Sequence, residues 1–199
     1  MTNQIAAPRY SQGVTRRRYI FDPPDRFVAG TIGEPGQRTF FLQARDSDRI
    51  VSVALEKVQV AVLADRLNQL LDELENRGIT DADAALENDS APLDEPLNEA
   101  FRAGVLTLGW DGSSERILVE AREQTEEDEA ALEAGEEIEH DAEDGPDLFT
   151  VRLTPPAARA FVERAVRVVA SGRPPCPLCG QPLDPVGHLC PRRNGHYVN

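Results

Sequence analysis

Residues 49–78, "RIVSVALEKVQVAVLADRLNQLLDELENRG", change their hydrophobic period partway along. The first eight residues are rich in Val, Ile and Leu, as a buried strand is. From Glu56 onward the apolar residues instead recur at steps of three and four, which predicts one face of an amphipathic helix. That face consists of Val60, Leu63, Leu67, Leu70, Leu71 and Leu74. Gly78 is a plausible residue to end the helix.

Two further strands are expected before this one. Residues 26–33, "RFVAGTIG", and residues 38–45, "RTFFLQAR", are short runs rich in Val, Ile, Phe and Thr. Between them, "EPGQ" places Pro35 and Gly36 at the central positions of a type II turn,. The first part of the chain therefore predicts a hairpin, a third strand and a helix.

The same order of elements recurs in the second half of the chain. Residues 101–111 and 115–123 are predicted strands joined by a turn, and residues 148–154 are a third strand,. A second helix is expected to follow, with Thr154 as its N-cap, Pro155 in its first turn and Gly172 at its end.

These two halves align as an internal duplication. "FVAG" at Phe27 matches "FRAG" at Phe101, 74 positions later, whereas the third strand and helix match 98 positions later. The difference equals the length of an acidic segment, which is interpreted as an insertion in the second copy. We therefore predict an α+β fold of two βββα repeats that share one core, with a mostly antiparallel sheet and two helices. A chance alignment of two βββα stretches is the alternative.

The predicted organisation has three parts. A disordered N-terminus precedes a duplicated body, and a small zinc-ribbon-like tail follows it. The boundaries are 1–15 for the N-terminus, 16–172 for the body (repeat 1 at 16–78, linker 79–100, repeat 2 at 101–172 with the acidic insert 123–146) and 173–199 for the tail.

Charge and hydropathy limit the classes of function. The net charge is -14, and 13 of the 35 acidic residues lie between Glu123 and Asp147, where no Lys or Arg occurs. This balance argues against a surface that generally seeks nucleic acid. The acidic insert could recruit a basic partner, although most such segments serve solubility alone. No stretch has the length of a signal peptide or a membrane span, so a cytoplasmic protein without membrane contact is expected.

All three cysteines of the chain lie in its last quarter, in "CPLCGQPLDPVGHLC" at residues 176–190. Cys176 and Cys179 have the CxxC spacing that lets two thiolates reach one metal ion, and Cys190 adds a third sulfur. With His188 they form the Cys3His set of a closed structural zinc site. Because six prolines between 174 and 191 leave little room for a hydrophobic core, a metal cross-link has a clear structural role there,.

Alternatives to this zinc site remain open at the level of sequence. His196 competes with His188 as the fourth ligand, since "CPRRNGH" resembles a knuckle without its second cysteine. The cysteines could also be plain thiols or a CxxC redox pair, although the surrounding prolines disfavour the helix that such a pair normally begins. A catalytic zinc ion would need an open coordination position.

The same blocks of sequence carry a resemblance to a known family. Residues 26–45, 52–67 and 172–195 resemble an actinobacterial protein family known only as a domain of unknown function. The resemblance covers most of the chain outside its first fifteen residues and its two acidic stretches. It implies no activity. Members of that family end in a similar tail with Cys and His, which supports Cys176, Cys179, His188 and Cys190 as one set.

A local excess of positive charge is expected on the second helix and the tail. It consists of Arg159, Arg164, Arg167, Arg173, Arg192 and Arg193. Such a patch could contact phosphate or RNA, but few aromatic side chains accompany it, and it could equally balance the acidic insert.

Two functions follow from these observations. The first is a non-enzymatic zinc-binding adaptor or regulatory protein that acts through an unknown protein partner, with RNA as a lesser candidate. It is favoured because no nucleophile triad or phosphate-binding loop occurs. The alternative is an enzyme acting on a phosphorylated small molecule in a cleft between the repeats. Its site would use Asp22, Asp25, Arg26, Arg38 and Arg45.

Overall fold

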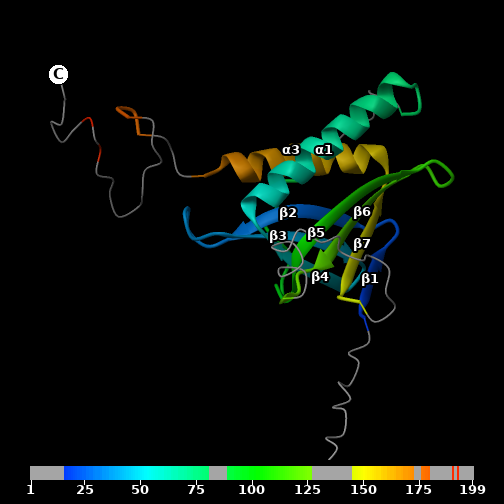
Figure 1. Cartoon of the computed structure of the whole chain (residues 1–199), viewed down its shortest axis with the longest axis horizontal. Coiled ribbons are helices and arrows are strands. Elements are labelled where there is room, and N and C mark those ends of the chain that lie inside the picture. Colours follow the sequence, from blue (N-terminus) through cyan, green and yellow to red (C-terminus); the bar gives the residue numbers. More distant parts are fainter. Residues whose placement is uncertain are drawn as a thin grey trace, which may run out of the picture.

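The computed structural model describes residues 16–80, 89–126, 145–172, 176–179, 190 and 192. Within these residues one seven-stranded sheet is covered by two helices, so the fold is mixed α+β, as predicted (Figure 1). The elements are β1 (Arg18–Phe21), β2 (Arg26–Ile32), β3 (Thr39–Asp46), β4 (Arg49–Leu55), α1 (Lys57–Asn76), β5 (Glu99–Asp111), β6 (Arg116–Glu123), β7 (Leu148–Leu153) and α3 (Pro155–Ala170).

The sheet consists of two antiparallel meanders placed side by side. Its order is β1-β7-β6-β5-β4-β3-β2. Strands β2, β3 and β4 form the first meander, and β5, β6 and β7 form the second. The meanders join through β4 and β5, which run parallel, and the short strand β1 pairs in parallel with β7. All strands therefore belong to one continuous sheet.

The sheet must curl, because β1 and β2 are consecutive in the chain but lie at its two ends. A flat sheet would separate them by roughly six strand spacings, or about 29 Å. The connection at residues 22–25 can span only about 19 Å. Curling brings Phe27 of β2 against Phe149 of β7, with 6.4 Å between their ring centroids. Strand β2, at one end of the sheet, thus packs across the core against β7, the strand next to the other end.

Local sequence chemistry explains where the elements begin and end. The Gln37 N–H donates to Glu34 O at 2.9 Å, and Gly36 has φ of 103°, which confirms the predicted type II turn,. Helix α1 ends at Asn76, and Gly78 follows its C-cap as predicted, with a φ of 68° that allows the Schellman hydrogen bonds,. At the start of α3, Thr154 Oγ1 accepts from the Ala157 N–H at 3.3 Å, so the predicted N-cap is also confirmed,.

Both helices lie on one side of the sheet and pack against each other (Figure 1). The predicted apolar face of α1 is buried or packed against the core along its length. On α3, Phe161 and Ala165 are buried, and Phe161 stacks on Phe27 at 4.6 Å. None of the described helices is long and apolar enough to cross a membrane.

The segment between the meanders differs from the expected linker. Residues 89–97, here called the strap, have no regular secondary structure, but they pack against β2 and β3 instead of simply joining the two halves. Leu93 of the strap lies so close to Gly30 that a Cβ atom on Gly30 would stand 2.6 Å from the leucine side chain. The glycine therefore makes room for the strap. Strand β1 was also not among the predicted strands.

Several predicted features fall outside the described residues. They are the N-terminus at 1–15, most of the acidic insert (127–144) and most of the tail, including His188 and His196.

Candidate metal centre

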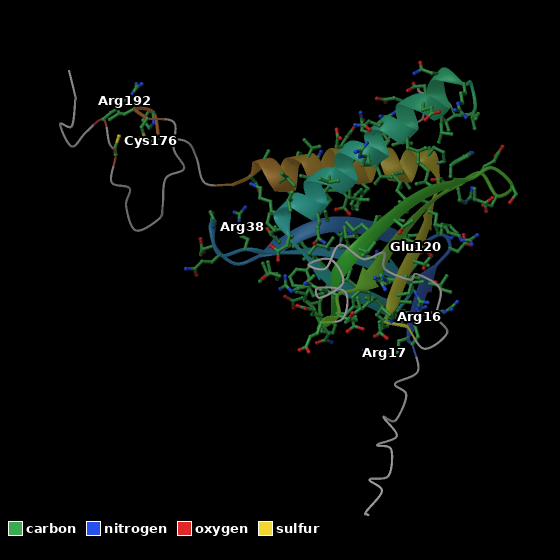
Figure 2. The ribbon with its side chains drawn as sticks, viewed as in Figure 1. Arg16, Arg17, Arg38, Glu120, Cys176 and Arg192 are labelled. Atoms are coloured by element: carbon green, nitrogen blue, oxygen red, sulfur yellow. The ribbon has the colours of Figure 1, made fainter. Side chains whose placement is uncertain are left out.

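The three cysteines come together after helix α3. Figure 2 shows Cys176 and Arg192 in the part of the chain that follows that helix. The sulfurs of Cys176, Cys179 and Cys190 all lie within 4.8 Å of one another. Cys176 and Cys190 are buried, and Cys179 is half-buried. This cluster contains every cysteine of the chain.

The spacing of the sulfurs fits a metal ion rather than a disulfide. Cys176 Sγ and Cys190 Sγ are 3.9 Å apart, whereas bonded sulfurs would be about 2.05 Å apart,. In a tetrahedral zinc site, bonds of about 2.3 Å place two thiolates roughly 3.8 Å apart. The observed spacing is therefore that of one edge of such a tetrahedron, and the chemistry of the donors suits a soft or borderline metal.

The CxxC turn also favours thiolate at Cys176. Hydrogen bonds from the backbone N–H of Cys179, and then of Leu178, lower the pKa of Cys176 to about 6, against the opposing effect of burial. Thiolates are the form that binds metal. The turn thus shifts the Cys176 sulfur toward the form that binds metal. The fourth ligand, predicted as His188 or His196, lies outside the described residues.

The arginines of α3 do not form the solvent-facing patch that was expected. Arg164 is 7% exposed, and its Nε donates to Ala29 O at 2.7 Å. Arg159 bonds Asn68 and Asp72 on α1. Both arginines are on α3 as predicted, but their charges meet acidic groups of the body because the two helices and the strap pack together.

The remaining members of the expected patch divide into two groups. Arg167 is exposed and donates to Asp89 O at 3.4 Å, and Arg192 is exposed in the tail. Arg173 and Arg193 lie outside the described residues.

The strap is held by a charge network that sequence reasoning missed. Asp89 accepts from Arg26 Nε at 2.6 Å and from Arg164 Nη1 at 2.8 Å. The hydrogen bond from Arg26 lowers the pKa of Asp89, and burial lowers the pKa of Arg164. Buried Gln43 contributes further bonds, because its amide pairs with the backbone N–H and C=O of Asp94. The acidic composition of residues 78–100 could have suggested these partners for the arginines of β2 and α3.

The residues named for the alternative enzyme do not meet in one place. Arg26 and Arg45 both approach Asp94 of the strap, at 3.0 and 3.4 Å. Arg38 instead donates to Ser171 O at 2.7 Å, at the end of α3 (Figure 2). These arginines are engaged with the protein itself.

The two aspartates named with them are placed apart as well. Asp22 lies 3.7 Å from Arg152, and Asp25 accepts the backbone N–H of Ser47 at 2.8 Å. Each carboxylate therefore has its own partner, and the two aspartates do not form one site.

Fold and cluster together define this chain as an α+β protein with a C-terminal group of three cysteines that could hold a metal ion. The profile of the family described as "Protein of unknown function (DUF3090)" matches residues 19–190, and the chain belongs to that family. The match reaches from β1 to the last cysteine, so the cluster is within the family's extent. No curated protein and no solved structure matches the chain.

Proposed function

We propose that this protein is a zinc-binding adaptor or regulator that acts through contacts with another protein. A structural zinc ion would be held by Cys176, Cys179 and Cys190, with His188 as the fourth ligand and His196 as its competitor. The observation that carries the proposal is the 3.9 Å spacing of two buried sulfurs beside a third. Zinc is favoured among metals because it accepts three thiolates and one imidazole in a closed tetrahedron.

A structural role is favoured over a catalytic one for this ion. Four protein ligands would leave no open position for water or substrate. The reducing cytoplasm keeps such thiolates available for metal, and we place the proposed role in that compartment. In this proposal the ion orders a tail that is rich in proline, and the ordered tail presents its surface to a partner.

The body of this adaptor is proposed to be a duplicated βββα unit. Both meanders lead into a helix, and the N-cap of α1 at Glu56 stands 98 positions before that of α3 at Thr154. Leu55 and its counterpart Leu153 are both buried, as are Phe27 and Phe101, 74 positions apart. The acidic insert accounts for the difference between the two offsets. Strand order supports this origin, because the second meander continues the sheet in the same direction as the first.

A protein partner is favoured over nucleic acid by the charges. The chain carries a net charge of -14, and the arginines of α3 that could contact phosphate are largely engaged with Asp72, Glu75 and Asp89. Basic surfaces of another protein are attracted to such a chain. The acidic insert would add to this attraction.

Native mass spectrometry of the purified full chain, with elemental analysis, tests the proposed metal. We expect about one zinc ion per chain, which a strong chelator removes. Cys176→Ser should lose the ion, whereas Leu178→Ala, which changes an exposed side chain between two ligands, should retain it. Trp110, the only tryptophan of the chain, lies in the body, and its fluorescence should be unchanged in both variants. A protein without metal and with three titratable thiols would refute the proposal.

A further inference from the structure

Strand β2 is one end of the sheet, and part of its outer edge is open. Ala29 accepts a hydrogen bond from Arg164 Nε on α3, so its carbonyl points away from β3. In an antiparallel pair, residues alternate between facing the partner strand and facing away from it. The outward-facing residues of β2 are therefore Phe27, Ala29 and Thr31.

Arg164 supplies a hydrogen-bond donor at Ala29, the middle one of these three residues. Its guanidinium occupies the edge at Ala29 and bonds the strap through Asp89 and Ala91. Within the described part of the chain, no residue bonds the outward-facing backbone groups of Thr31. An exposed edge of this kind is a template for pairing with another extended segment.

A cavity of about 460 Å³ lies directly beside this open edge. Its walls are the end of β2, the strap and one side of α3, and they include Thr31, Ile32, Leu93, Arg164 and Val168. Ile32 is 51% exposed, which leaves an apolar side chain available to a ligand. The volume falls in the range of about 300 to 1,000 Å³ that is typical of binding pockets. The cavity thus combines an unpaired backbone edge with walls that are partly apolar and partly charged.

The charge around the cavity indicates which segment fits it. Glu95 of the strap lines the cavity and is exposed, and no bond of its side chain to the described residues occurs. The chain as a whole carries a net charge of -14. A basic side chain on the incoming segment would meet Glu95, and an apolar one would meet Ile32 or Val168.

We propose that a partner protein inserts an extended segment of alternating apolar and basic residues between the strap and α3, where it pairs with β2 at Thr31. This inference rests on the proposed function, because it names the kind of partner that the adaptor binds. This groove is the cavity between β2, the strap and α3, and no cysteine lines it.

The test uses the full chain, labelled with nitrogen-15, and the capped hexapeptide Val-Lys-Val-Lys-Val-Lys as a probe. Amide hydrogen exchange is measured with and without the peptide. We expect the outward-facing amide of Thr31 to exchange several-fold more slowly in the complex, while that of Gly30, which already pairs with β3, is unchanged. Unchanged exchange at Thr31, or protection confined to other elements, would overturn the inference.

Two substitutions test the pairing and the charge separately. Thr31→Pro removes an outward N–H without breaking the β2–β3 ladder, and should weaken peptide binding at least about tenfold, whereas Thr31→Val should not. Glu95→Lys should weaken binding by about 2- to 5-fold. Equal binding by Thr31→Pro would refute strand pairing, and equal binding of Val-Glu-Val-Glu-Val-Glu would refute the basic segment.

Peptide binding is measured again with Cys176→Ser, so that a failure of this inference can be told from a failure of the proposed zinc site. Because the groove lies in the body, this variant should bind the hexapeptide as the parent does. Loss of peptide binding in Cys176→Ser would contradict the placement of the groove. A chain that holds zinc but does not bind the peptide would refute this inference and leave the proposed metal site standing.

Discussion

Phe27 and Phe149 lie with their ring centroids 6.4 Å apart, although their strands stand near opposite ends of a seven-stranded sheet. Phe149 is fully buried, and Phe27 also stacks on Phe161 of α3. This contact ties the curl of the sheet to the packing of the second helix. It is possible because the chain between β1 and β2 is too short to let the sheet open.

Substitution of Phe149 by Ala should lower the free energy of unfolding by about 3 to 5 kcal/mol, since it removes a large side chain from the core. A double-mutant cycle of Phe27→Leu and Phe149→Leu should give a coupling of about 0.5 to 1.5 kcal/mol. Guanidinium unfolding followed by Trp110 fluorescence measures both quantities. Val58→Ala, at a position that is 65% exposed, is the control and should change stability little,. Absence of coupling would mean that β2 and β7 do not pack against each other through these two rings.

Arg164 is expected to be a second point of high sensitivity. Replacement by Met would leave Ala29 O without the donor from Arg164. It would also remove one of two donors from the strap carbonyls of Asp89 and Ala91, which keep their bonds from Arg167 and Arg26. The unpaired Ala29 carbonyl and the lost ion pair with Asp89 should together cost about 2 to 4 kcal/mol,. Denaturant unfolding measures this loss.

Arg152→Ala provides the comparison for Arg164. Arg152 is 39% exposed and stands 3.7 Å from Asp22, so its loss should cost at most about 1 kcal/mol,. Similar costs for the two variants would contradict the burial of Arg164.

The sequence predicted the elements of this fold well because each is determined by local chemistry. The change of period at Glu56, the turn at Pro35 and Gly36, and the cap at Thr154 all act within a few residues. Contacts between residues far apart in the chain determine the pairing of the meanders, the curl of the sheet and the position of β1. Local sequence patterns do not predict such contacts.

The same distinction applies to the candidate site. CxxC spacing and a third cysteine were sufficient to predict the cluster of Cys176, Cys179 and Cys190, since ligand chemistry restricts the types of residue. The arginines of α3 were expected to face solvent because their spacing alone does not reveal Asp89. That carboxylate reaches them only once the strap folds back over β2.

The pKa of Asp89 gives this network a pH dependence. Its hydrogen bond from Arg26 lowers the pKa of Asp89 in the folded state. As the pH falls, Asp89 is therefore protonated at a higher pH in the unfolded chain than in the folded protein. The stabilisation is present above about pH 4, the unfolded pKa, and is lost as the pH falls through the folded value. We therefore expect Asp89→Asn to be less stable than the parent at pH 7 and to approach it below pH 4. A stability difference that does not shrink on acidification would contradict this linkage.

Gly30 and Leu93 offer a test of how the strap packs. An added Cβ at Gly30 would lie 2.6 Å from Leu93 Cγ and Cδ2, so Gly30→Ala should destabilise the protein by about 1 to 3 kcal/mol,. When Leu93 is already replaced by Ala, Gly30→Ala should lower the stability by less, because the side chain that it would clash with is absent. Urea unfolding of the parent, the two single variants and the double variant gives the coupling between Gly30 and Leu93. Gly109→Ala, where the nearest side chain would be 4.0 Å away, is the matched control on β5.

The fourth ligand of the proposed zinc site can be assigned by two histidine variants. His188→Gln should weaken zinc binding by more than the roughly 10- to 100-fold that loss of an outer-sphere partner costs, because it removes one of four direct bonds. His196→Gln should leave zinc affinity close to that of the parent. Competition with a chromogenic chelator at pH 7 measures both affinities, and Trp110 fluorescence verifies that the body remains folded. The opposite order would assign His196 to the ion, and two unaffected variants would show that the three cysteines bind without either histidine.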